Sequence, residues 1–186
     1  MEKIIISILF AIFIIAAITP RIIQKRKKVE TVGCIGINRR LFFLGKISLF
    51  SSYISILIQV YFVNLSIFEP NIIFFWICIV LVGFGVLLFT LAIRALGTFS
   101  LRVGLAQEKS ALRTTGIYRF SRNPMLLGLY LIAIGSAIFV QNPVNWILVI
   151  IALFIHHKVI LAEEKFLYER FGDEWIEYQN KVHRYL

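Results

Sequence analysis

Two short groups of residues in the C-terminal half could do chemistry together. The first is Arg122-Asn123-Pro124, in which Asn123 suits the N-cap and Pro124 the first position of a helix. The free backbone N–H groups of that helix start, with the Arg122 guanidinium beside them, would bind an anion. The second group is Glu163-Glu164, two carboxylates at the end of a long apolar run, where a bound cation would explain them.

Each group also has a plainer interpretation. Asn123-Pro124 could simply begin a membrane span, with the nearby arginines at lipid headgroups, and Glu163-Glu164 could be a solvated helix end. A ligand that carries one carboxylate and one ammonium would need both groups at once. The amino-acid end of S-adenosylmethionine is such a ligand, and many other ligands fit the same description.

The elements that must position these residues are long and apolar. Hydrophobic residues make up 59% of the 186 residues and the mean hydropathy is +0.84, beyond what a soluble domain of this size can bury. Five apolar runs are predicted to be membrane spans, and the first and fourth fall short of the ~20 residues that cross a bilayer core. They are residues 4–18, 44–65, 72–93, 124–140 and 144–162.

The predicted fold class is therefore an all-α integral membrane protein with about five transmembrane helices and a cytoplasmic amphipathic C-terminal tail. It is a single membrane domain, residues 1–186, because its length leaves no room for a second one. Residues 1–95 hold three spans. Residues 96–186 hold a loop, a helical hairpin and the tail.

The distribution of charge predicts the orientation in the membrane. The net charge is +10, and basic residues gather in residues 21–40 and 94–122, whereas residues 66–71 carry only Glu69 and residues 141–145 carry no charge. Positive loops stay on the cytoplasmic side, so the N-terminus is predicted outside and the C-terminus inside. The same distribution explains the basic excess through membrane lipids, so no nucleic-acid partner is predicted.

The tip of the predicted hairpin and the tail also carry local sequence signals. Asn142-Pro143 predicts the tip of a tight hairpin between the last two spans. Residues 163–186 are too polar to span and are predicted to form two short amphipathic helices. Gly172 would follow the end of the first of these helices, and Asp173 would be the N-cap of the second.

Small residues and histidines in the spans have structural interpretations. Neighbouring residues on a helix point about 100° apart, so His156 and His157 cannot easily share one metal ion, and no metal site is predicted. Four glycines are predicted to provide small faces for close packing of the third and fourth spans. They are Gly83, Gly85, Gly128 and Gly135.

Taken in order along the chain, the C-terminal motifs resemble the isoprenylcysteine carboxyl methyltransferase family and its phospholipid N-methyltransferase relatives. These are small membrane enzymes that use S-adenosylmethionine. The resemblance covers residues 96–186 and is specific through the combination of its pieces. The pieces are GIYRFSRNP at 116–124, a hairpin of two spans, Glu163-Glu164, FGDEWIEY at 171–178 and a closing V-x-R at 182–184.

The resemblance implies roles for the matching positions. Arg122 and Glu163 would be the catalytic residues, and the stretch 112–118 would hold the cofactor through its backbone and a tyrosine. Gln107 would match a further cofactor contact, across a difference in spacing. The full set of implied cofactor-binding residues is Gln107, Leu112, Gly116, Ile117, Tyr118, Arg122, Asn123, Pro124, Glu163 and Glu164.

Three positions depart from the family pattern, and they concern the methyl acceptor. Asn123 replaces the usual histidine, and Leu126 replaces a tyrosine. Val159, with Lys158 beside it, replaces the arginine that binds the substrate carboxylate. Leu126, Lys158 and Val159 are the predicted substrate-binding residues. A buried carboxylate without a paired cation is costly, so the last of these departures, at Val159, weakens a carboxylate acceptor and favours a neutral amine or thiol.

The predicted function is S-adenosylmethionine-dependent methyl transfer to a small lipophilic molecule or lipid in the membrane. Two alternatives share the scaffold: methylation of a phospholipid amine or a thiol, and a non-catalytic or NADPH-reductase-like protein. Cofactor binding separates methyl transfer from the reductase, and a turnover assay separates an enzyme from a non-catalytic relative.

Overall fold

The structure is a computed structural model, and it describes residues 2–26, 37–68, 71–96 and 112–186. Within these ranges the chain is helical, which confirms the predicted all-α class. In chain order the helices are α1 (Glu2–Arg26), α2 (Arg39–Tyr61), α3 (Ile72–Leu96), the short 3-10 helix η1 (Gly116–Arg119), α4 (Pro124–Val140), α5 (Pro143–Phe171) and α6 (Asp173–Lys181).

The apolar character of the helices makes the chain a multi-pass integral membrane protein. By length and composition, α2, α3 and α5 can each cross a membrane, while the apolar stretch 3–19 of α1 and the whole of α4 are shorter. Large apolar side chains also face outward, such as Val80, Ile150 and Phe154, each more than 60% exposed. That surface suits lipid and would be unfavourable in water.

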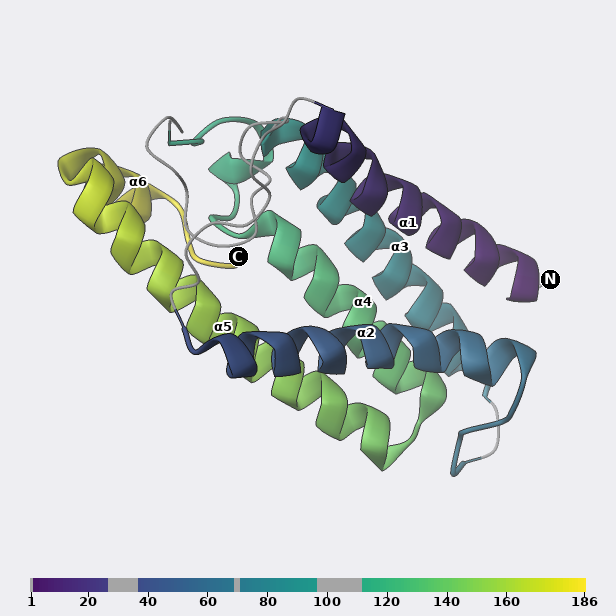
Figure 1. Cartoon of the computed structure of the whole chain (residues 1–186). Helices are drawn as coiled ribbons and strands as arrows, with labels where there is room; N and C mark the ends of the chain where they lie inside the picture. Colours follow the sequence, from purple (N-terminus) through teal and green to yellow (C-terminus); the bar gives the residue numbers. More distant parts are fainter. Residues whose placement is uncertain (1, 27–36, 69–70, 97–111) are drawn as a thin grey trace.

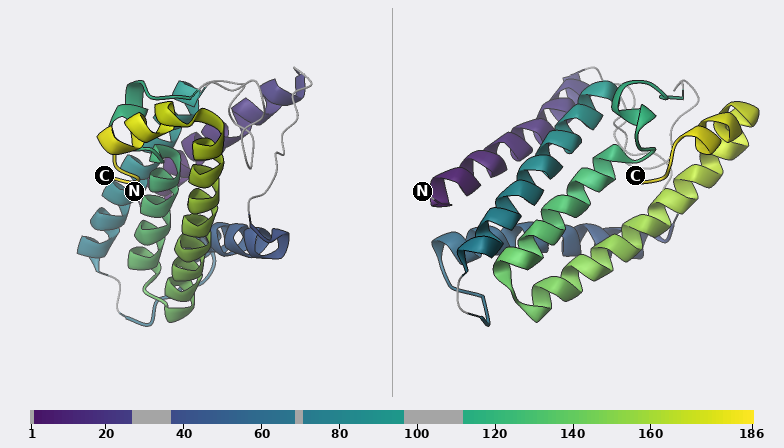
Figure 2. Two further views of the ribbon diagram at one scale, coloured as in Figure 1. Left: turned by 90° about the vertical axis from the view of Figure 1, so that its left-hand side faces the viewer. Right: turned by 180° about the vertical axis from the view of Figure 1, so that it is seen from behind.

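Helix α4 lies at the centre of the arrangement (Figure 1). It packs along α3 on one side and beside α5 on the other, and α1 packs on α3. Helix α2 crosses this layer and contacts α5 and α4. Viewed from behind, α2 passes across the far face of the other helices (Figure 2). The crossing is fixed by polar contacts as well as packing, since the Tyr53 hydroxyl donates to the Leu129 carbonyl at 2.9 Å.

Glycines allow α3 and α4 to approach closely. A Cβ on either Gly85 or Gly128 would lie 2.6 Å from the backbone oxygen of the other, so neither position has room for a side chain. A Cβ on Gly135 would lie 3.0 Å from Val82 Cγ2. The predicted packing role is confirmed for these three glycines. It is wrong for Gly83, where the nearest atom to an added Cβ is a Leu9 methyl 4.0 Å away.

The tail differs from the prediction of two short helices. Helix α5 runs without a break to Phe171, so Glu163 and Glu164 lie inside one 29-residue helix. Residues 163–170 contain good helix formers such as Glu, Lys and Leu, and they extend the span past its apolar part. Gly172, with φ of +49°, ends α5, and Asp173 is the first residue of α6 rather than its N-cap.

The helix boundaries agree with the prediction at α4 and at the starts of α3 and α5, whereas α1 runs on to Arg26 instead of ending at residue 18. The second span begins at Arg39 and ends at Tyr61, earlier at both ends than the predicted 44–65. The predicted hairpin tip is confirmed: Gln141 ends α4 in the left-handed region, and the Asn142 side chain accepts from the Val144 N–H at 2.9 Å.

Candidate functional site

One end of the bundle gathers most of the residues that the sequence analysis selected. Five segments meet there: the start of α4, the end of α5, η1, α6 and residues 182–186. Residues 182–186 are called the terminal segment. Figure 2 shows the chain turning back after α6, so that its C-terminus lies near the start of α4. A site at this end is therefore built from segments more than 60 residues apart.

Glu164 is the centre of an ion-pair network. Its carboxylate accepts two hydrogen bonds from Arg184, from Nε at 3.0 Å and from Nη2 at 2.7 Å. Arg122 Nη2 lies 3.3 Å from the same carboxylate, and the side chains of Glu164 and Arg122 are only 13% and 10% exposed. The paired geometry and the low exposure make this a strong interaction that joins α4, α5 and the terminal segment.

Arg122 is held on three sides. Its guanidinium carbon lies 5.5 Å from the centre of the Trp175 ring on α6, and its backbone N–H donates to the His183 carbonyl at 2.9 Å. Its Nε is buried and finds no acceptor among the described residues. Arg122 Nε–H is therefore a buried donor that has no acceptor among the described residues, even though the same guanidinium is paired with Glu164 through Nη2.

Asn123 stands at the predicted N-cap position of α4, but its side chain makes no capping hydrogen bond. Its amide nitrogen instead donates to the Arg184 carbonyl at 3.2 Å, and Ser121 Oγ donates to the same carbonyl at 3.4 Å. Pro124 is the first residue of α4 and has no N–H. The first turn of α4 therefore keeps its free N–H groups without a side-chain cap, as an anion site requires.

Glu163 contrasts with its neighbour. It is half-buried, and among the described residues it takes part in no ion pair. Its carboxylate acts electrostatically on the hydroxyls of Tyr118 and Tyr130, so it lies close to η1 and α4. Burial, followed by the neighbouring Glu164, raises the pKa of Glu163 to about 7, so the charged carboxylate is costly in this place unless a cation pairs with it.

The predicted cofactor segment 112–118 packs against α6. The Tyr178 hydroxyl donates to the Tyr118 carbonyl at 2.7 Å, and burial raises the pKa of Tyr178 to about 12, so the hydroxyl stays protonated at neutral pH. Burial, followed by Tyr178 and Glu163, raises the pKa of Tyr118 as well. Leu112 packs on a cluster formed by Trp175, Tyr178 and Val182.

Gly116, the first residue of η1, has φ of +67°, a conformation that a residue with a side chain rarely adopts. Ile117, the next predicted cofactor residue, is half-buried in η1. Gln107 lies outside the described residues.

The predicted substrate-binding residues lie in different surroundings. Leu126 is half-buried on α4 and Val159 is buried on α5. Lys158 is exposed, and its ammonium nitrogen lies 5.3 Å from the centre of the Phe154 ring on the outer face of α5. The described part of the chain brings together no three metal-ligating side chains.

Sequence reasoning missed several residues of this end. It did not connect Arg184 with Glu164, although the closing V-x-R motif contains that arginine. It also missed a contact between His157 on α5 and Tyr185 in the terminal segment, where the imidazole Nδ1 lies 2.7 Å from the hydroxyl. No spacing rule predicts such a contact, because its partners come from two separate elements.

The fold and this end of the bundle define a multi-pass helical membrane protein whose polar groups gather at one end. The chain belongs to the phospholipid methyltransferase family, whose model matches residues 73–174, more than half of the chain. The match includes both glutamates and the Arg122-Asn123-Pro124 step. It ends before the terminal segment.

Curated relatives are similar to part of this chain. A protein-S-isoprenylcysteine O-methyltransferase of Saccharomyces cerevisiae is 42% identical over 69 residues, which are 37% of this chain and 29% of that protein. A probable protein-S-isoprenylcysteine O-methyltransferase of Oryza sativa subsp. indica is 35% identical over 78 residues, 41% of each chain. The chain thus spans less than half the length of these curated relatives.

A solved structure shares the fold. It is that of the eukaryotic intramembrane Ras methyltransferase, an isoprenylcysteine carboxyl methyltransferase, and it superimposes with a TM-score of 0.54. The superposition covers 78% of this chain and 52% of that one at 23% sequence identity.

Proposed function

We propose that this chain is an S-adenosylmethionine-dependent methyltransferase of the isoprenylcysteine carboxyl methyltransferase type, acting on a lipophilic acceptor at the membrane surface. One observation carries the proposal. At one end of the bundle, and among the described residues, the half-buried Glu163 carboxylate forms no ion pair and the buried Arg122 Nε–H finds no acceptor. A ligand with an ammonium and a carboxylate completes both groups.

The residues present fit the amino-acid end of S-adenosylmethionine. Glu163 would hold the ammonium, while Arg122 Nε–H and the free N–H groups of the first turn of α4 would hold the carboxylate. The buried hydroxyl of Tyr118 and the backbone of 112–118 would complete the site. When bound, the sulfonium supplies an electrophilic methyl group.

The chain itself then positions the reacting groups and excludes water. Glu164, Arg184 and Trp175 hold Arg122 in one place, so little reorganisation is needed when the ligand binds. Apolar side chains such as Leu126 and Val159 would exclude water from the acceptor. The names of the relatives, which describe methyl transfer to isoprenylcysteine, support the same assignment.

A second acceptor class is favoured by a specific observation. Val159 is buried where the resemblance places a carboxylate-binding arginine, and Lys158 beside it is exposed with its ammonium over Phe154. Neither residue offers a cation on the inner face of α5. We therefore include a neutral amine or thiol on a lipophilic molecule as the alternative acceptor.

Binding of the cofactor is the first test. Titration calorimetry of the purified chain in a mild detergent should detect S-adenosylmethionine binding. Glu163→Ala should weaken it by about 1.5–3 kcal/mol, roughly 10- to 150-fold in Kd, the range for a hydrogen bond to a charged group. The matched control is Glu169→Ala, which removes an exposed carboxylate from the same helix. Absence of binding by the intact protein would reject the assignment.

The acceptor class is tested by transfer of a radiolabelled methyl group. A farnesylcysteine analogue, a phosphatidylethanolamine and an alkyl thiol would be compared in parallel. Base-labile methyl ester on the farnesylcysteine analogue alone identifies a carboxylate acceptor. Product on either of the other two identifies an amine or thiol.

The orientation in the membrane is part of the proposal. The basic segments 21–40 and 94–122 place these loops in the cytoplasm, and with five spans the N-terminus is outside and the C-terminus inside. A reporter fused after Leu186 should be active only in the cytoplasm. Activity of that fusion on the outer side would overturn the orientation.

A further inference from the structure

Three hydrogen-bonding side chains from three elements form a row beside the site. Tyr185 of the terminal segment lies at the middle, with its hydroxyl 2.7 Å from His157 Nδ1 on α5. On its other side its ring lies 6.0 Å from the ring of Tyr130 on α4, so the two phenol side chains are neighbours. The row therefore runs from Tyr130 through Tyr185 to His157.

The two ends of this row lie in different surroundings. Tyr130 is only 8% exposed and its hydroxyl senses the charge of Glu163, the proposed cofactor ligand. It also follows Leu126 by one helical turn, so both lie on one face of α4. His157 is half-buried, as is Tyr185. The row thus leads from the interior of the site toward its edge.

The Tyr130 hydroxyl is not committed to a strong partner. Its hydrogen bond to the Leu153 carbonyl is 3.5 Å long, at the limit of such a bond. A hydroxyl held this weakly can accept a proton from a neighbouring group while it gives up its own.

The acceptor chemistry decides whether such a row is needed. A carboxylate has no proton to lose at neutral pH, whereas a thiol must lose its S–H proton on methylation, and a neutral amine must lose an N–H proton to give a neutral product. Water is excluded from a site lined by Leu126 and Val159, so the proton needs a path through the protein.

We propose that Tyr130, Tyr185 and His157 form a proton relay for an amine or thiol acceptor, an inference that rests on the proposed methyltransferase function. The acceptor lone pair bonds to the methyl carbon as the carbon–sulfur bond breaks, with its electron pair left on sulfur. The acceptor proton passes to the Tyr130 oxygen, the Tyr130 proton passes to Tyr185, and the Tyr185 proton passes to His157 Nδ1. The resulting imidazolium releases a proton to water.

The test compares two acceptors with one variant. Tyr185→Phe keeps the ring and removes the hydroxyl that links the relay. It should lower kcat for an alkyl thiol about 100-fold, the low end for general acid–base catalysis, and leave the Kd of S-adenosylmethionine and the KM of the thiol unchanged. Any methylation of a farnesylcysteine carboxylate should keep its rate. Tyr168→Phe, an exposed tyrosine on α5, is the control.

A second variant separates the relay from a structural role of the terminal segment. His157→Ala should show the same loss with the thiol, and added imidazole should restore part of the rate. Equal losses for both acceptors, a silent Tyr185→Phe, or a thiol that is never methylated would each overturn the relay. Calorimetric binding of S-adenosylmethionine in those cases would leave the cofactor assignment standing.

Discussion

The two ends of the helical bundle are closed by different kinds of polar contact. At the end that holds the candidate site, charged side chains meet: Glu164 is paired with Arg122 and Arg184. At the hairpin end, formed by residues 61–68 and 140–146, neutral side-chain amides make the polar contacts. Asn142 Nδ2 donates to the Leu65 carbonyl at 2.8 Å, and Gln59 Oε1 accepts from the Leu65 N–H at 2.7 Å.

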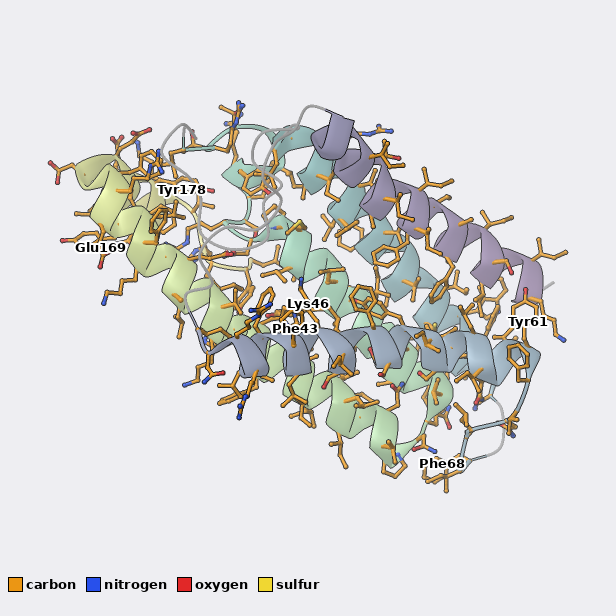
Figure 3. All side chains as sticks on the ribbon, viewed as in Figure 1. Phe43, Lys46, Tyr61, Phe68, Glu169 and Tyr178 are labelled. Atoms are coloured by element: carbon orange, nitrogen blue, oxygen red, sulfur yellow. The ribbon has the colours of Figure 1, made fainter. Side chains whose placement is uncertain are left out.

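The contrast between neutral and charged contacts separates polar groups that stabilise the fold from polar groups that the fold does not require. Neutral side chains are enough to satisfy the backbone where helices turn at a membrane surface. At the other end, among the described residues, the Arg122 Nε–H finds no acceptor and Glu163 forms no ion pair. These are the groups that the proposed ligand would complete. Figure 3 shows Tyr178 close to the end that holds the candidate site, and Tyr61 and Phe68 close to the hairpin end.

The largest effect on stability is expected from removing the charge of Glu164. Glu164→Gln leaves Arg122 and Arg184 without their shared counterion, which should lower the free energy of unfolding by about 3 kcal/mol, the low end for breaking a buried pair because Arg184 is a third exposed. Thermal unfolding in detergent would measure it, and trypsin should cut after Arg184 faster. An unchanged unfolding curve would mean that the network does not close this end.

The central packing of α3 on α4 should be the next most sensitive feature. Gly128→Ala places a methyl group 2.6 Å from the Gly85 carbonyl oxygen and should destabilise the chain by about 2 kcal/mol. Gly83→Ala is the matched control, since its methyl group would meet only Leu9 at 4.0 Å. Equal losses for the two variants would contradict the close contact.

A smaller effect is expected at the hairpin end. Asn142→Ala removes the cap of α5 and should cost about 1 kcal/mol. Asn142→Asp keeps the capping oxygen but loses the donor to Leu65. It should therefore destabilise the chain less than Asn142→Ala, and its remaining loss of unfolding free energy measures the hydrogen bond to Leu65 alone. A loss as large as that of Glu164→Gln would erase the contrast between the two ends.

The smallest effect is expected from an exposed ion pair on the same helix as Glu164. Lys165 and Glu169 are 79% and 61% exposed and 3.9 Å apart, so solvent screens their attraction. Glu169→Gln should leave unfolding unchanged within the precision of the experiment. A clear loss there would show that charge alone, without burial, stabilises this end.

Much of the fold could be predicted because its signals are local. Runs of apolar residues gave the spans, and Asn142-Pro143 gave the hairpin tip. The extension of α5 through Glu163 was missed because composition marks where a helix leaves the membrane, and a helix ends only where a residue such as Gly172 stops it. The role of Gly83 was misjudged because small residues indicate packing only on the face that meets another helix.

The candidate site was harder to predict for a physical reason. Adjacent residues on a helix point about 100° apart, so sequence alone cannot tell which of Glu163 and Glu164 faces an arginine. The answer depends on the terminal segment, whose path is set by tertiary contacts. Asn123 shows the same limit: its position at the start of α4 was predictable, and the partner of its amide was not.

The link between Asn123 and the Arg184 carbonyl joins residues 61 positions apart, which has a consequence for biosynthesis. Helix α4 can leave the ribosome before Arg184 has been synthesised, because α5 and α6 lie between them in the chain. During that interval Glu164 has no Arg184 beside it, and Arg122 has no His183 carbonyl to receive its N–H. The closing of this end is therefore a late, long-range folding step that follows the synthesis of the terminal segment.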